Sequence, residues 1–61
     1  MNLEEFKRLS HDYLGDGAYV GDAGQVYVII TTDGITIQNE ICLGAYEIKA
    51  LNNFIASRKD A

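Results

Sequence analysis

The sequence predicts a small α+β protein built as a three-stranded antiparallel meander with an N-terminal and a C-terminal helix packed on one face, in the order α-β-β-β-α. Two observations predict this class. Runs of β-branched residues surround an Asp33-Gly34 pair in the middle of the chain, and apolar residues recur at helical spacing near both ends. With 61 residues, the chain has room for one domain, 1–61.

The central segment, residues 25–43, reads as a β-hairpin, because Asp-Gly supplies the positive φ angles of a tight turn. A two-residue turn at Asp33-Gly34, or a four-residue loop of the same parity, gathers alternate apolar residues on one face. A three-residue turn would mix the faces. The residues expected on this apolar face are Val26, Val28, Ile30, Ile35, Ile37, Ile41 and Leu43.

The chain before this hairpin is expected to form a helix, a turn and a short strand. Asn2 suits an N-cap, and apolar residues at helical spacing predict a helix over residues 2–13 that ends before Gly15. A glycine-rich turn at residues 15–17 leads to a strand at 18–21. A three-residue loop at residues 22–24 would pair Val20 with Val26 and place both on the apolar face.

Residues 45–58 carry the stripe of a second helix, with Ile48, Leu51 and Ile55 on one side and Phe54 beside them. Arg58 and Lys59 close this helix with cations, which suits its negative end. Both helices are expected to cover the apolar face of the sheet.

Composition and charge exclude several classes of function. The net charge of −4, without a basic stripe, argues against direct nucleic-acid binding. The sequence holds no run of roughly 18 apolar residues, so no membrane span is expected. A single cysteine, Cys42, excludes an internal disulfide, and with no signal-like segment the chain is expected in a reducing cytoplasm.

No group of residues predicts catalysis, a metal or a cofactor. Ser10, His11 and Asp12 are consecutive and diverge on a helix, and His11 with Cys42 supplies too few ligands for a metal. The glycine-rich segment lacks the strand-loop-helix context of a phosphate cradle. Turn roles are expected for Asp16, Asp22 and Asp33, and Asn39 on the apolar face is expected to bond backbone groups.

The opposite face of the sheet is the predicted contact surface. Tyr19, Tyr27 and Ile29 would cluster there, with Gln38 and Glu40 on its polar side. Tyrosine favours interfaces because it joins a large apolar area to a polar tip. The patch indicates self-association, a homodimer first, slightly ahead of binding to another protein, and the two are compatible.

Three motifs resemble a group of very small, mostly uncharacterised proteins encoded by bacteriophages and prophages. They are Tyr-Leu-Gly-Asp-Gly at residues 13–17, Asp33-Gly34, and Asn-Glu-Ile-Cys-Leu at residues 39–43. That group commonly continues with Leu-Glu-Pro, where this chain has Leu43-Gly44-Ala45. The resemblance implies a phage-type accessory protein acting in a bacterial cytoplasm, and it assigns no catalytic residue.

These observations together favour a non-enzymatic binding protein that inhibits a bacterial host protein or defence system by occupying its surface. Two alternatives remain open. One is an oligomer that sequesters a small nucleotide-like signal against its tyrosines, although the chain has few cations to bind such a signal. The other is a structural module that assembles only with itself.

Overall fold

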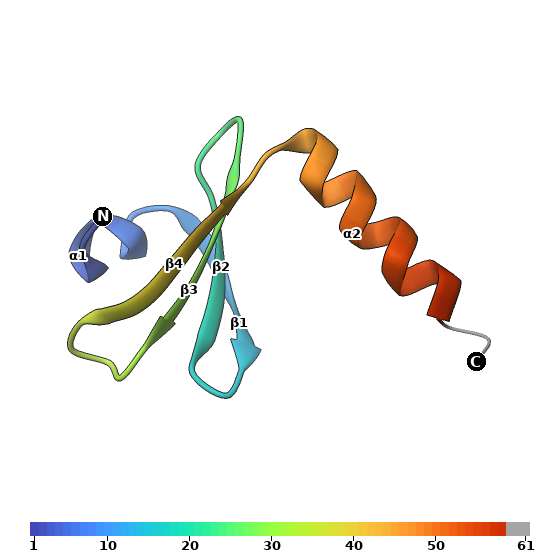
Figure 1. The fold of residues 1–61 in the computed structure, drawn as a ribbon. Coiled ribbons are helices and arrows are strands. Elements are labelled where there is room, and N and C mark those ends of the chain that lie inside the picture. The colour runs from blue at the N-terminus through green and yellow to red at the C-terminus, as the bar shows by residue number, and fades with distance from the viewer. Residues whose placement is uncertain (59–61) are drawn as a thin grey trace.

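The computed structural model describes residues 1–58 and has an α+β architecture with one antiparallel sheet (Figure 1). Its elements are α1 (Leu3–Lys7), β1 (Ser10–Gly15), β2 (Ala18–Asp22), β3 (Tyr27–Thr32), β4 (Ile37–Leu43) and α2 (Ala45–Arg58). The strands follow one another across the sheet in the order β1-β2-β3-β4. The antiparallel meander is confirmed, but it has four strands where three were expected.

The additional strand comes from the segment predicted to complete the first helix. Asn2 caps α1 as expected, accepting from the Glu5 amide at 2.9 Å, while the Glu5 carboxylate accepts from the Asn2 amide at 3.2 Å. The helix nevertheless ends at Lys7. The prediction of a helix to residue 13 is wrong because residues 10–15 pair with β2 instead.

The glycine-rich turn is confirmed, now as the connection of a hairpin between β1 and β2. Gly15, Asp16 and Gly17 all have positive φ, at 119°, 53° and 79°. This reversal brings Tyr13 opposite Tyr19, with ring centroids 4.9 Å apart. The tyrosine hydroxyl of Tyr13 also accepts from the Gly17 amide at 3.2 Å, which ties the strand to its own turn.

The loop between β3 and β4 has four residues and is closed by the pair Thr32 and Ile37. This is the four-residue alternative, and it places Ile37 against the core as expected. The register then shifts by one residue, because Thr31 pairs with Asn39 and leaves Gln38 as a β-bulge. A shift of one residue turns every later side chain to the other face.

The face assignment for the end of β4 is therefore wrong. Ile41 and Leu43 pair with Ile29 and Tyr27, away from the core, while Glu40 and Cys42 pair with Ile30 and Val28. Ile35 lies in the loop and is 80% exposed.

The connection between β2 and β3 also differs from the expected three-residue loop. The strands are closed by Asp22 and Tyr27, so the loop holds residues 23–26, with Gly24 at a φ of 98°. Because the loop is one residue longer, Tyr19 pairs with Ile30 on the core side. Val20 pairs with Ile29 on the opposite side, so the predicted faces of β2 are exchanged.

The core is small and lies between α1 and one face of the sheet. Phe6 of α1 is 1% exposed and packs on Val28 and Ile30 of β3. Leu3 and Leu9, on either side, and Tyr19 and Ile37 of the sheet complete the cluster.

Helix α2 has the predicted bounds but not the predicted position. It follows β4 through Gly44 alone and lies on the side of the sheet opposite α1, diverging from the strands (Figure 1). None of its residues is buried. Arg58 ends the helix as predicted, while Lys59 lies outside the described residues.

Candidate functional site

The side of the sheet away from α1 carries an apolar surface that we call the open face. The strand register brings together side chains from β2, β3 and β4 there: Val20, Tyr27, Ile29, Ile41 and Leu43. Tyr27 is 42% exposed and Ile41 is 54% exposed. Since α1 packs on the other face, these side chains are left without a covering layer from that helix.

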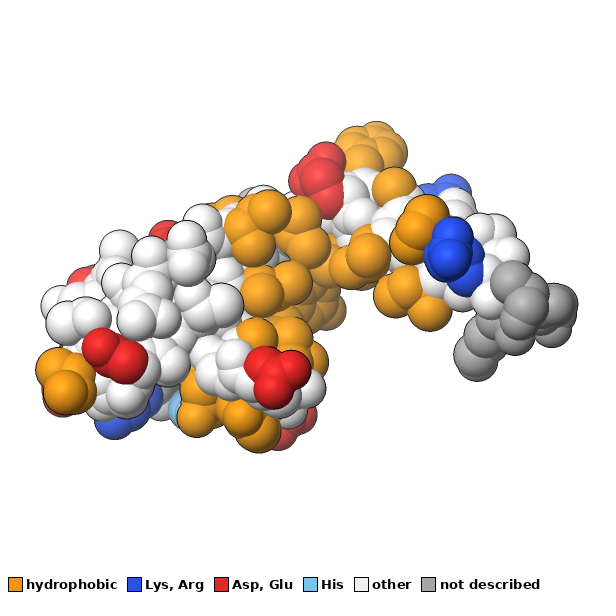
Figure 2. Space-filling model, turned by 60° about the horizontal axis from the view of Figure 1, so that its bottom comes forward, with side chains coloured by type: hydrophobic (Ala, Val, Ile, Leu, Met, Phe, Trp, Pro, Cys, Tyr) orange, Lys and Arg blue, Asp and Glu red, His pale blue; other side chains and the backbone are white. Residues whose placement is uncertain are grey.

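A second uncovered apolar surface runs along α2. Ile48, Leu51 and Ile55 share one side of the helix, and Phe54 flanks them beneath the guanidinium of Arg58, 5.5 Å from its ring centroid. Leu51 and Ile55 are 40% and 50% exposed. We call Ile48, Leu51 and Ile55 the α2 stripe. Figure 2 shows hydrophobic side chains of the sheet and of α2 turned to the same side of the molecule.

The structure separates the residues that were predicted to form one contact patch. Tyr27 and Ile29 lie on the open face, as their spacing requires. Tyr19 lies on the opposite face, half-buried against the core with its ring centroid 6.5 Å from that of Phe6. Glu40 shares that side, 3.6 Å from the N-terminal amine, and Gln38 sits in the bulge.

Sequence reasoning missed Ile41, Leu43 and Val20 as members of this surface. It assigned Ile41 and Leu43 to the core because it gave β4 an unbroken alternation, and Val20 because it placed a three-residue loop between β2 and β3. One signal was available: in a strand Asn39 shares a face with Ile41 and Leu43, and an amide is a poor core residue. Asn39 in fact donates to the Thr31 hydroxyl at 2.9 Å on the open face.

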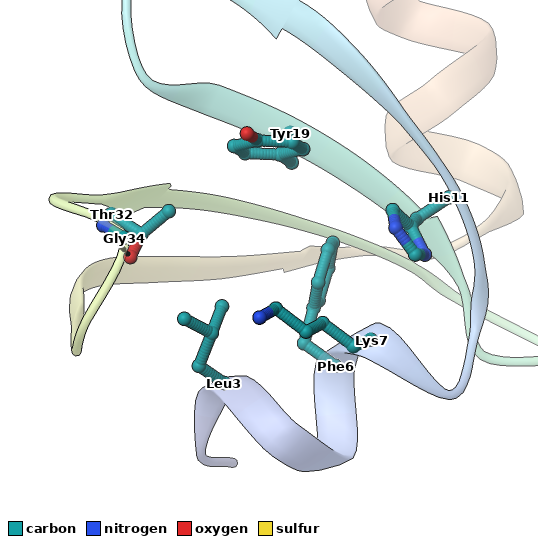
Figure 3. A pocket seen from close by; sticks show the side chains of 7 residues that line it. All are labelled: Leu3, Phe6, Lys7, His11, Tyr19, Thr32 and Gly34. Carbon is teal, nitrogen blue, oxygen red and sulfur yellow. Dashed lines mark hydrogen bonds between the residues drawn. The ribbon is translucent and has the colours of Figure 1, made fainter.

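A groove of about 360 Å³ opens between α1 and the sheet on the other side (Figure 3). Its walls come from α1, β1, β2, the end of β3 and the loop that follows: Leu3, Phe6, Lys7, His11, Tyr19, Thr32 and Gly34. Lys7 and His11 project into it beside the rings of Phe6 and Tyr19 (Figure 3). The groove therefore joins aromatic surface to a cation.

His11 and Cys42 lie on different strands of the sheet. His11 lies with Nδ1 2.7 Å from the Leu9 carbonyl oxygen, in β1, whereas Cys42 is in β4 at the other edge of the sheet. Three strand spacings, about 14 Å, separate these two edges, so the pair forms no relay. Among residues 1–58 no three metal-ligating side chains gather.

Turn roles are confirmed for Asp22 and Asp33. Asp22 Oδ1 accepts from the Gly24 amide at 2.8 Å. Asp33 Oδ1 accepts from the amides of Thr36 and Ile35, both at 2.9 Å, and these bonds hold the pKa of its carboxyl below the ordinary value of 3.8.

Neither helix in residues 1–58 has the length and apolar character needed to cross a bilayer. Comparison of the chain with protein-family models, with curated proteins and with solved structures found no match.

Proposed function

We propose that this chain is a non-enzymatic binding protein, a phage-type accessory protein that inhibits a bacterial host protein by occupying its surface. The observation that carries this proposal is the amount of apolar surface that the fold leaves uncovered, on the open face and along α2. Surfaces of this kind in small proteins mark contacts with other proteins. The phage-type motifs supply the expected setting, a bacterial cell.

The geometry of the polar groups supports contact over catalysis. His11 and Cys42 lie at opposite edges of the sheet, and the aspartates whose bonds are described hold turns. A binding protein needs no such constellation; it needs shape, apolar area and a few aromatic anchors. Tyr27 on the open face is an anchor of the preferred type.

Native mass spectrometry of the tagged chain purified from bacterial cells tests this proposal. We expect a host protein to co-purify at a fixed stoichiometry with the wild type and to be lost with Ile41→Lys on the open face. Tyr46→Lys, at a residue that is 86% exposed on α2, is the matched control and should retain it. A spectrum that contains only copies of the chain itself would overturn the host-binding proposal.

The groove beneath α1 favours a second candidate function, the sequestration of a small aromatic anion such as a nucleotide. Its volume of about 360 Å³ is at the lower end for small-molecule sites, and Tyr19 and Lys7 offer stacking and charge. A panel of nucleotides should then raise the melting temperature of the wild type, with a smaller rise for Lys7→Gln. The absence of any shift across the panel would exclude this candidate.

A further inference from the structure

We infer that the partner of the open face is the α2 stripe of a second copy of this chain, and that the exchange is reciprocal across a two-fold axis. Each copy would lay its α2 on the other's sheet, so that both uncovered surfaces are buried in one step. This inference rests on the proposed contact surface: the second copy occupies it in the free protein, and a host protein would bind there by displacing that copy. The groove beneath α1 stays outside the interface and remains free for another ligand.

A chain cannot readily cover its own open face with its own α2. Gly44 is the only residue between β4 and α2, whereas strand-to-helix connections usually take about 2 to 6 residues. The start of α2 is fixed, because the Gly44 amide donates to the Glu47 carboxylate at 2.8 Å and the Ile48 amide donates to the Gly44 carbonyl at 2.9 Å. This short junction holds the helix away from the strands that precede it (Figure 1).

The uncovered area matches what a stable dimer needs. The chain exposes 4779 Å², and a folded monomer of 6.7 kDa is expected to expose roughly 3900 Å². The difference is close to the area of about 800 Å² that each partner contributes to a standard interface. The radius of gyration, 12.7 Å, likewise exceeds the value of about 10.5 Å expected for a compact chain of this length.

The two surfaces are complementary in chemistry. An apolar helical stripe with residues at positions i, i+3 and i+7 is the form in which helices dock on apolar surfaces. Arg58 lies on the flank of this stripe, and Asp12 lies at the side of the open face through its pairing with Val20. A reciprocal arrangement can bring these opposite charges to the rim, where they would favour this orientation.

Light scattering coupled to size-exclusion chromatography of the purified chain alone tests the dimer. Wild type and Tyr46→Lys should be dimers, because Tyr46 lies on the side of α2 away from the stripe. Leu51→Lys and Ile41→Lys should each weaken dimerisation by roughly 30-fold or more, the size expected for a residue at an interface centre. Leu51 is unburied, so its variant should keep the circular dichroism of the sheet. A wild type that stays monomeric at a protein concentration of about 100 μM, roughly a hundredfold above the Kd of a micromolar dimer, would overturn the inference.

Cross-linking between two differently labelled chains tests the reciprocal geometry. In a Cys42→Ser background, one chain carries Leu51→Cys and the other carries Ile29→Cys. The mixture should give the mixed cross-linked pair in preference to either like pair. Cross-linking of Leu51→Cys only to itself would show contact between two α2 helices and overturn the exchange. Because no host protein is present, failure here leaves the host-binding proposal to its own test.

Discussion

Gly21 in β2 is the residue on which the packing of α1 depends most closely. A Cβ at this position would lie 2.8 Å from Phe6 Cε1 and 3.1 Å from Leu9 Cδ1. The Phe6 ring is 1% exposed, so it has little room to move aside. The absence of a side chain at Gly21 therefore lets α1, which covers the core, approach the sheet.

Replacing this glycine by alanine has two opposed effects on the free energy of unfolding, and the sign of the change shows which one is larger. Gly21→Ala should lower the free energy of unfolding by about 1 to 3 kcal/mol, because overpacking outweighs the usual gain from removing a glycine. Urea denaturation measures the change. In a Phe6→Leu background the same substitution should cost less, and an equal cost in both backgrounds would show that the aromatic ring is not the obstacle.

Asp33 links the hairpin loop to pH. Since hydrogen bonds from Thr36 and Ile35 lower the pKa of its carboxyl in the folded chain, ionised Asp33 contributes stability above its unfolded pKa. That contribution is lost as the pH falls through the depressed folded value. An NMR titration of the Asp33 carboxyl carbon should give a midpoint below 3.8, and a midpoint at or above 3.8 would contradict this account. Asp33→Asn should remove this part of the acid dependence.

Helix α1 is short enough to depend on its capping residues. The reciprocal bonds between Asn2 and Glu5 satisfy two backbone amides of a helix that has five residues. Asn2→Ala should lower the free energy of unfolding by about 1 kcal/mol, while Asn2→Asp should retain most of it. Thermal denaturation of the three proteins provides the comparison, and equal stability of all three would show that Phe6 alone holds α1 in place.

At the level of elements, the sequence predicted what depends on local chemistry. The N-cap at Asn2, the positive φ of Gly34 and the bounds of α2 are confirmed because a few neighbouring residues determine each of them. Strand register depends instead on whether a loop is one residue longer or a strand holds one extra residue as a bulge. The bulge at Gln38 exchanged the faces of Ile41 and Glu40, and the sequence marks it only indirectly, through the amide of Asn39 on a face that was expected to be core.

The segment 10–15 shows a second limit. Apolar residues at helical spacing in the first turn favoured continuing α1, and nothing local forbade it. The hairpin with β2 prevails because pairing across Gly15–Gly17 brings the Tyr13 ring against the Tyr19 ring, at a tilt of 54°, and satisfies the backbone of the strand. The helical spacing of apolar residues carries no sign of this tertiary gain.

At the scale of the whole molecule, the sheet has one face that α1 covers and one face that α1 leaves uncovered. Phe6, Val28 and Ile30 are the only fully buried large side chains among residues 1–58, which is a small core for a chain of this length. The open face and the α2 stripe are the surfaces that could enlarge it. Burying them against a second copy would serve stability and assembly at once.

Hydrogen exchange of the α2 amides at several protein concentrations tests whether a second copy covers α2. A lone helix of 14 residues without tertiary contacts is marginal in water, so its amides should exchange quickly unless a partner covers it. We predict that protection of α2 rises with concentration in the wild type and in Tyr46→Lys, and stays low in Leu51→Lys. Protection of α2 that is the same at every concentration would contradict the account.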